Sequence, residues 1–116
     1  MIKAIFFDID GTLVSFNTHR ISQSDIDAIS MAKAKGVRIY ISTGRPLSLI
    51  NNLDEIKHLI DGYITANGAL CFSGDKIISC TPVPEGDVMT VIKFSDSMKF
   101  PCMVVGEKDL TMYNSD

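Results

Sequence analysis

In the first half of the chain, short continuous apolar runs alternate with stretches in which apolar residues recur at helical spacing. Residues 2–7 form a short, nearly continuous apolar run rich in branched and aromatic side chains, and residues 37–41 form a second. Runs of this kind predict strands, the first of them buried on both faces within a parallel sheet. Between them, residues 22–35 begin with a Ser-x-x-Asp capping pattern, carry apolar residues at helical spacing and precede Gly36. Strand, helix and strand in this order predict a βαβ unit with a right-handed crossover.

Further along the chain, the pattern first extends this sheet and then changes. Residues 47–57 have apolar positions at helical spacing, which predicts a second helix, and residues 59–65 predict a turn and a third strand. From residue 70 the predicted elements are a hairpin over 70–80, a helix over 84–99 and a second hairpin over 102–113. The order of these elements, hairpin, helix and hairpin, therefore predicts a separate α+β segment.

Composition and charge limit the class of protein. With 116 residues, of which 46% are hydrophobic and 22% charged, the chain can bury one core and has no room for a second complete domain. The net charge of −3 and the lack of a Lys/Arg block argue against a nucleic-acid partner. No apolar stretch is long enough to cross a bilayer and the N-terminus runs directly into the first strand, so we expect a cytoplasmic protein without a membrane partner. Cys71, Cys80 and Cys102 lack the spacing of a disulfide framework or a zinc site.

Two acidic residues, Asp8 and Asp10, stand at the end of the first predicted strand. Residues two apart on an extended backbone project to the same side, so we expect their carboxylates to converge on one small volume. Like charges so close need a cation or a shared proton between them. Oxygen ligands suit Mg²⁺, so the pair predicts a magnesium site. The structural alternative is an Asx turn at Asp10-Gly11, with Asp8 capping a nearby backbone group.

The segments around these residues favour the chemical interpretation. Residues 8–14, Asp-Ile-Asp-Gly-Thr-Leu-Val, resemble the first signature of the haloacid dehalogenase-like (HAD) phosphohydrolases, D-x-D-G-T-L/V. Residues 42–46, Ser-Thr-Gly-Arg-Pro, end the second predicted strand and resemble the second HAD signature in the T-G-R-P form of the Cof-type branch. Residues 62–69, Gly-Tyr-Ile-Thr-Ala-Asn-Gly-Ala, also look like Cof-type proteins.

The two signatures are expected to meet. Open parallel sheets bind ligands outside the carboxyl ends of their strands, and both segments stand at such ends. Thr43 offers a hydroxyl and Gly44 an unobstructed amide, while Pro46 suits the first position of a following helix whose amides point at an anion. Arg45 is placed either to pair with a substrate oxygen or to brace the loop, and both roles stay open.

The resemblance implies an α/β fold, in which a Rossmann-like HAD core with a parallel sheet is followed by the start of an α+β cap of ββαββ order, the type IIB cap. The Asn-Gly-Ala segment is where Cof-type proteins leave the core and enter the cap. Residues 1–67 are therefore expected to be the N-terminal part of the core domain and residues 68–116 a partial cap domain. Taken alone, Asn67-Gly68 favours a hairpin turn.

The resemblance also implies a Mg²⁺-dependent phosphomonoester hydrolase. Asp8 would attack phosphorus to form an aspartyl-phosphate, and Asp10 would protonate the leaving group and then activate water. Mg²⁺ held by Asp8 and Asp10, the latter through its backbone carbonyl, would offset the repulsion between carboxylate and phosphate. Thr43, Gly44 and the Ile9 amide would hold the phosphoryl oxygens. The implied substrates are small phosphorylated metabolites such as sugar phosphates.

Two later family motifs are missing from the 116 residues. Family members use a Lys and an acidic Gly-Asp-x-x-Asp segment beyond the cap, and neither is found. We therefore expect a fragment or natural truncation of a larger phosphatase, weakly active or inactive alone. One alternative is a non-catalytic phosphate-binding, metal-binding or regulatory fragment, and another is a phosphotransferase or mutase. A two-component receiver domain fits the Thr-Gly-Arg-Pro segment poorly, and the sequence predicts no oligomeric state.

Overall fold

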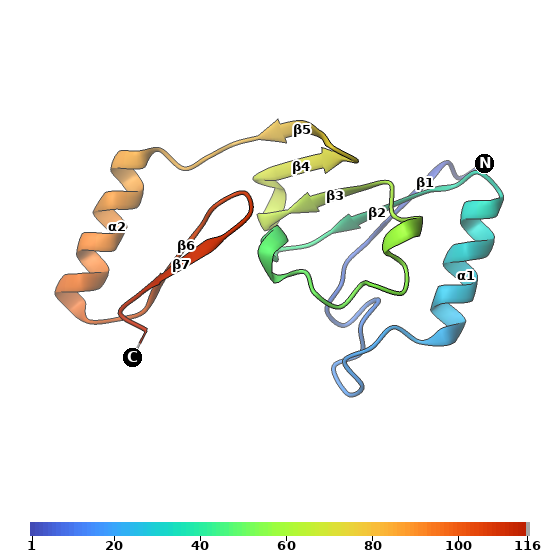
Figure 1. Cartoon of the computed structure of the whole chain (residues 1–116), viewed down its shortest axis with the longest axis horizontal. Coiled ribbons are helices and arrows are strands. Elements are labelled where there is room, and N and C mark those ends of the chain that lie inside the picture. The colour runs from blue at the N-terminus through green and yellow to red at the C-terminus, as the bar shows by residue number, and fades with distance from the viewer. Residues whose placement is uncertain (116) are drawn as a thin grey trace. The chain divides into compact units, whose positions relative to one another are not determined.

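The computed structural model describes residues 1–115 and contains two compact units (Figure 1). Unit 1 comprises Met1–Cys80 and unit 2 comprises Thr81–Asp116. Unit 1 is built on a five-stranded sheet with the order β1-β2-β3-β4-β5. Its strands are β1 (Ala4–Phe7), β2 (Arg38–Ser42), β3 (Gly62–Thr65), β4 (Leu70–Ser73) and β5 (Lys76–Cys80).

The predicted strand, helix and strand unit is present in unit 1. β1 pairs in parallel with β2, and β2 pairs in parallel with β3. The helix α1 (Gln23–Ala34) connects β1 to β2, and its N-cap Ser22 accepts a hydrogen bond from the Asp25 amide. After the helix, Gly36 has a φ of 85°, a left-handed conformation that glycine adopts at little cost. The α/β class and the parallel pairing are thus confirmed.

The core of unit 1 joins β2 to α1. Ile39 and Ile41 of β2 are fully buried and belong to one apolar cluster with Ile29 of α1. The same cluster takes in the loop that follows β1 and the chain before β3, through Ile9, Leu13, Val14, Ile21, Leu53 and Ile56. Because Ile9 lies between Asp8 and Asp10, core packing fixes the backbone where the acidic residues stand.

The first strand is shorter and more exposed than its apolar sequence suggested. Ile2 lies outside β1 and is 69% exposed, and Phe6 within β1 is 56% exposed. Phe6 stacks on Tyr40 of β2 with ring centroids 4.8 Å apart, on the face opposite Ile39 and Ile41. The expected burial on both faces was therefore wrong. Within residues 1–115, β1 is an edge strand that packs only its other face on the core.

The helix predicted over residues 47–57 does not form. Two single-turn 3-10 helices stand at the ends of this stretch, η1 (Leu47–Leu49) and η2 (Lys57–Leu59). Pro46 is extended, with φ −69° and ψ 157°, so it is not the first residue of an α-helix. The expectation that helical amides after Pro46 would point at an anion is therefore also wrong.

Two weak helix formers stand between the two turns. Asn51 and Asn52 are adjacent, and Asn has a lower intrinsic helix propensity than most residues. Leu53 and Ile56 nevertheless reach the core and are 3% and 0% exposed. The periodic spacing thus predicted correctly that these two side chains are buried, although they lie in a loop and not in a helix.

The hairpin predicted over residues 70–80 is present and extends the sheet. β4 pairs antiparallel with β3, and β5 pairs antiparallel with β4. One 3-10 turn, η3 (Ala66–Gly68), connects β3 to β4, so Asn67 lies in a hairpin connection. By its contacts the hairpin belongs to unit 1. The functional boundary between core and cap at residues 67 and 68 stays a prediction.

Unit 2 contains the later helix and hairpin that the sequence predicted. Its elements are α2 (Glu85–Met98), β6 (Cys102–Val105) and β7 (Leu110–Tyr113), the two strands being antiparallel. Ser95 of α2 is fully buried, where its hydroxyl donates to the Phe100 carbonyl and accepts from Nδ2 of Asn114. In the part of the chain that the structure describes, neither helix is long and apolar enough to cross a membrane.

Candidate active site

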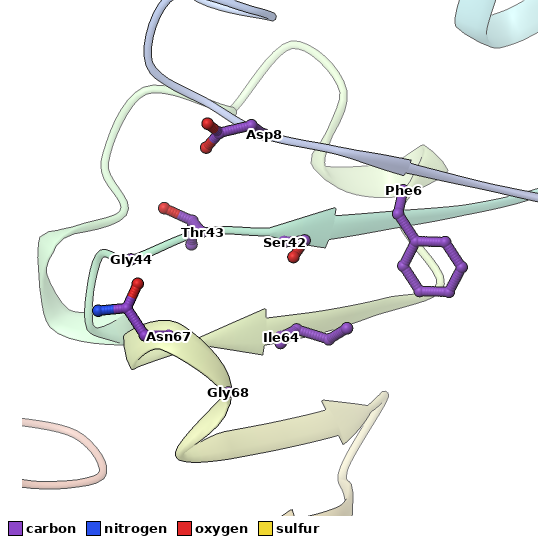
Figure 2. Close-up of a pocket in the computed structure, with 8 residues that line it drawn as sticks. All are labelled: Phe6, Asp8, Ser42, Thr43, Gly44, Ile64, Asn67 and Gly68. Atoms are coloured by element: carbon purple, nitrogen blue, oxygen red, sulfur yellow. The ribbon is translucent and has the colours of Figure 1, made fainter.

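The carboxyl ends of β1, β2 and β3 border an open cavity of about 580 Å³. It is lined by Phe6, Asp8, Ser42, Thr43, Gly44, Ile64, Asn67 and Gly68. Figure 2 shows the polar groups of Asp8, Thr43 and Asn67 at the same end of the three strands. Parallel strands bring their carboxyl ends to one sheet edge, so the two signature segments meet as expected.

Asp8 is the carboxylate of this cavity. It directly follows β1, it is exposed, and its Oδ1 accepts a hydrogen bond of 2.7 Å from the Ile9 amide. The Ile9 side chain is fully buried, which holds the backbone on both sides of it in place. The Ile9 amide, predicted to hold a phosphoryl oxygen, is thus engaged by Asp8 in this structure.

Asp10 is not among the residues that line the cavity. The chain turns at Ile9, whose carbonyl accepts hydrogen bonds from the amides of Thr12 and Val14. The extended geometry from which both carboxylates were expected to converge therefore ends at Ile9. The expected convergence of the two carboxylates on one volume is therefore wrong, while the catalytic and metal-binding roles of Asp8 and Asp10 stay predictions.

The carboxylate of Asp10 is held by Arg45. Nη2 of Arg45 lies 2.5 Å from Oδ1 of Asp10 and Nε lies 2.8 Å from Oδ2, a two-point pairing. Nη1 of Arg45 donates to the Leu49 carbonyl at 2.9 Å. The hydrogen bond from Arg45 lowers the pKa of Asp10, and burial acts in the opposite direction. Of the two roles considered for Arg45, this geometry shows the bracing one.

Thr43 and Gly44 form the second side of the cavity. The Thr43 side chain is buried, and its Oγ accepts a hydrogen bond of 3.0 Å from the Arg45 amide. The Thr43 hydroxyl proton is therefore left to donate to a ligand. A Cβ added to Gly44 would lie 2.9 Å from Oδ1 of Asn67, so the absence of a side chain lets Asn67 approach the backbone. The Gly44 amide has no acceptor within residues 1–115.

The Asp8 carboxylate and the Asp10 carbonyl are oxygen ligands of the kind that a hard cation takes. Within the described residues, no group of three or more His, Cys, Asp or Glu side chains is placed to hold a metal. The Asp10 carboxylate is committed to Arg45, but the Asp10 carbonyl accepts no hydrogen bond from residues 1–115. Mg²⁺ keeps several waters and takes one or two protein carboxylates, so Asp8 with the Asp10 carbonyl fits such an ion.

Asn67 is the cavity residue whose role sequence reasoning left open. It follows β3, the third strand whose carboxyl end reaches the cavity. The rule that assigned Asp8 and Thr43 to one sheet edge applies equally to a polar residue after β3. Applied to all three strand ends, that rule would have included Asn67.

Comparison with known proteins finds sequence matches to a hydrolase family and to named phosphatases. The sequence model of a family described as haloacid dehalogenase-like hydrolase matches residues 5–116. YxeH of Bacillus subtilis (strain 168), named as a phosphatase, is 32% identical over 121 residues, covering 100% of this chain and 44% of its own. The 5-amino-6-(5-phospho-D-ribitylamino)uracil phosphatase YcsE of the same organism is 44% identical over 68 residues. This match covers 59% of this chain and 27% of the YcsE chain.

A solved structure agrees with the sequence matches. The HAD subclass IIB sugar phosphatase BT4131 is 48% identical, with a TM-score of 0.90, over 98% of this chain and 45% of its own. The chain thus spans less than half the length of each of these three relatives.

Proposed function

Since this chain belongs to the haloacid dehalogenase-like hydrolase family, we propose that it carries the nucleophile and phosphate-binding side of a Mg²⁺-dependent phosphomonoester hydrolase. The observation that carries the proposal is the cavity at the strand ends, where the Asp8 carboxylate faces the Thr43–Gly44 corner. BT4131 is described as a sugar phosphatase, which supports sugar phosphates and related small phosphomonoesters as the substrate class. A cytoplasmic location stays a prediction.

Asp8 is the nucleophile in this proposal. One of its carboxylate oxygens forms a bond to phosphorus as the bond from phosphorus to the leaving oxygen breaks, which leaves an aspartyl-phosphate. Water then cleaves that acyl-phosphate and releases inorganic phosphate. Asp8 is suited to this task because it is exposed in the cavity, and its one hydrogen bond within residues 1–115 comes from the neighbouring Ile9 amide.

The neutral donors opposite Asp8 hold the phosphoryl group. The Thr43 hydroxyl and the Gly44 amide are both free to donate into the cavity. Mg²⁺ bound by Asp8 and the Asp10 carbonyl would offset the charge repulsion between a carboxylate and a phosphate dianion. Donors that are already oriented before the substrate arrives lose little free energy to reorganisation.

Asp10 is the acid and base in this proposal. It would give a proton to the leaving oxygen and later take one from the attacking water. Both steps require the carboxylate to turn from Arg45 towards the cavity, because Arg45 pairs with both Asp10 oxygens and lowers the pKa of Asp10. Arg45 acts on this step indirectly, because its two contacts to Asp10 set the resting position of that carboxylate. We assign Arg45 as a positioning residue and not as a direct substrate ligand.

The test is release of p-nitrophenolate from p-nitrophenyl phosphate with Mg²⁺ and the chain in excess of substrate. These single-turnover conditions report the first bond cleavage alone, so they detect Asp8 attack even where the later step is slow. Asp8→Asn should lower the release to the level of buffer. The matched control is Asp75→Asn, an exposed acid in the turn between β4 and β5, which should react like the unaltered chain.

Release that is equal in the unaltered chain and in Asp8→Asn would overturn the proposal. Transfer of the phosphoryl group to an added sugar acceptor, in place of release to water, would instead favour the phosphotransferase or mutase alternative. The type IIB cap role of residues 68–116 is part of the proposal, and the phosphate half-site in unit 1 does not depend on it.

A further inference from the structure

The connection between β3 and β4 places a carboxamide in the cavity. Asn67 lies in η3 and lines the cavity with Asp8 and Thr43. In Figure 2 its side chain lies beside Gly44, at the same strand ends from which the polar groups of Asp8 and Thr43 project. Asn67 therefore stands on the third side of the space that the proposed function assigns to a phosphoryl group.

The backbone at Asn67 has a costly conformation. Ala66, Asn67 and Gly68 have φ values of 49°, 55° and 96°, so three consecutive residues are left-handed. For a residue with a Cβ this costs on the order of 1 kcal/mol or more, and least for Asn. The turn of a hairpin does not by itself require a left-handed alanine at its first position. Contacts with other segments must therefore hold Ala66 in this conformation.

Those contacts tie the turn to the Thr43–Arg45 segment. The Ala66 amide donates to the Arg45 carbonyl at 2.9 Å, and the Asn67 amide donates to the Thr43 carbonyl at 3.2 Å. The carboxamide of Asn67 packs against the bare backbone of Gly44, where a Cβ would lie 2.9 Å from Oδ1. The position of the Asn67 side chain is thus fixed relative to the donors proposed to bind phosphate.

The hydrogen-bonding groups of this side chain are unused. No residue within 1–115 makes a hydrogen bond to Oδ1 or Nδ2 of Asn67, although the backbone amides of Asn67 and of the preceding Ala66 both donate to the Thr43–Arg45 segment. Within the same residues no Lys or Arg lines the cavity. Arg45 follows Gly44 in the chain, but its guanidinium is paired with Asp10. A phosphoryl group has three non-bridging oxygens, and Thr43 and Gly44 supply donors for two of them.

Resting on the proposed function, we infer that Asn67 is a ligand of the phosphoryl group. Oδ1 and not Nδ2 is the carboxamide atom nearer Gly44 in this structure (Figure 2), so the carboxamide turns about its Cβ–Cγ bond and Nδ2 then donates a hydrogen bond to a non-bridging oxygen beside those held by Thr43 and Gly44. The competing explanation is that Asn67 only supplies a residue that tolerates a positive φ. Glycine tolerates this conformation at least as well, so substitution by glycine separates the two explanations.

The experiment measures the affinity of the full chain for inorganic phosphate by calorimetry with Mg²⁺ present. Asn67→Gly keeps the positive φ and removes the donor, and we expect it to weaken phosphate binding about five- to tenfold. Asn67→Asp keeps the shape of the side chain but replaces a donor by a negative charge, so its loss should be larger. The control is Lys99→Gly, an exposed residue with φ 59° that does not line the cavity, which should bind phosphate within about twofold of the unaltered chain.

Each outcome decides the inference. Unchanged affinity in Asn67→Gly would show that the residue serves the turn alone, and an equal loss in Lys99→Gly would show an unspecific effect; either overturns the role of Asn67. If Asp8→Asn still abolishes p-nitrophenolate release while Asn67→Gly binds phosphate normally, the proposed function stands and only this inference fails. If the unaltered chain binds no phosphate with Mg²⁺, the proposed phosphate site fails and the inference fails with it.

Discussion

Arg45 and Asp10 form a two-point ion pair between the two signature segments, although they are 35 residues apart in the chain. The pair joins the loop after β1 to the loop after β2, and Arg45 Nη1 extends the connection to the Leu49 carbonyl. Both side chains remain partly exposed, at 29% for Arg45 and 41% for Asp10. Water screens the attraction between exposed charges. We therefore expect this ion pair to fix the geometry of the two loops more than it stabilises the fold.

Substitution of Arg45 should therefore change the rate more than the binding of substrate. Lysine has a single charged centre and cannot reproduce the planar fork, so we expect Arg45→Lys to lower kcat about three- to tenfold and to change KM less than about twofold. Steady-state hydrolysis of p-nitrophenyl phosphate measures both constants, and Arg38→Lys on β2 is the matched control. A rise in KM with unchanged kcat would instead show that Arg45 contacts the substrate.

Glycine substitutions should separate backbone strain from steric clash in unit 1. Gly36 has a positive φ and open space where a Cβ would lie, so Gly36→Ala should cost about 1 kcal/mol of unfolding free energy through strain alone. Gly11 also has a positive φ, and a Cβ there would lie 2.6 Å from Cε2 of Phe16. Urea denaturation should show a larger loss for Gly11→Ala, unless the exposed Phe16 ring moves away freely, in which case the two losses would be equal.

The ion pair between Lys33 and Asp61 should make the stability of unit 1 depend on pH. Lys33 Nζ lies 2.5 and 2.6 Å from the two Asp61 oxygens, and the Ile39 amide donates to Oδ2 at 2.8 Å. Burial raises the pKa of Asp61, but the hydrogen bonds from Lys33 and Ile39 outweigh it together and leave the pKa below 3.8. The stabilisation is therefore complete above the unfolded pKa and is lost as the pH falls through the lower folded pKa.

Asp61→Asn should accordingly lower the unfolding free energy by about 1 to 2 kcal/mol at neutral pH, with a difference that shrinks as the pH falls through the lowered folded pKa of Asp61. Urea denaturation at several pH values measures this. Asp27→Asn on α1 is the control, because the Asp27 side chain is exposed and bonds only to Gln23 among the described contacts. A constant difference between Asp61→Asn and the unaltered chain at all pH values would contradict the assigned role of the ionised carboxylate.

The sequence was informative wherever the physical cause was local. Ser22 and Gly36 mark the ends of α1 because capping and left-handed φ depend on a few neighbouring residues. The periodic spacing over residues 47–57 identified Leu53 and Ile56 as buried, but it could not show that the backbone would loop to bury them. Periodicity reports which side chains avoid water, and several backbone paths satisfy the same requirement.

The sequence by itself determined the α/β class, the acidic strand end at Asp8 and the family to which the chain belongs, because short motifs and hydrophobic spacing encode them directly. Only the tertiary structure decided that Asp10 pairs with Arg45 and that Asn67 enters the cavity beside Gly44. Those contacts join residues from three different strand ends. They arise from the parallel alignment of β1, β2 and β3, and the position of a distant strand end is not written in the local sequence.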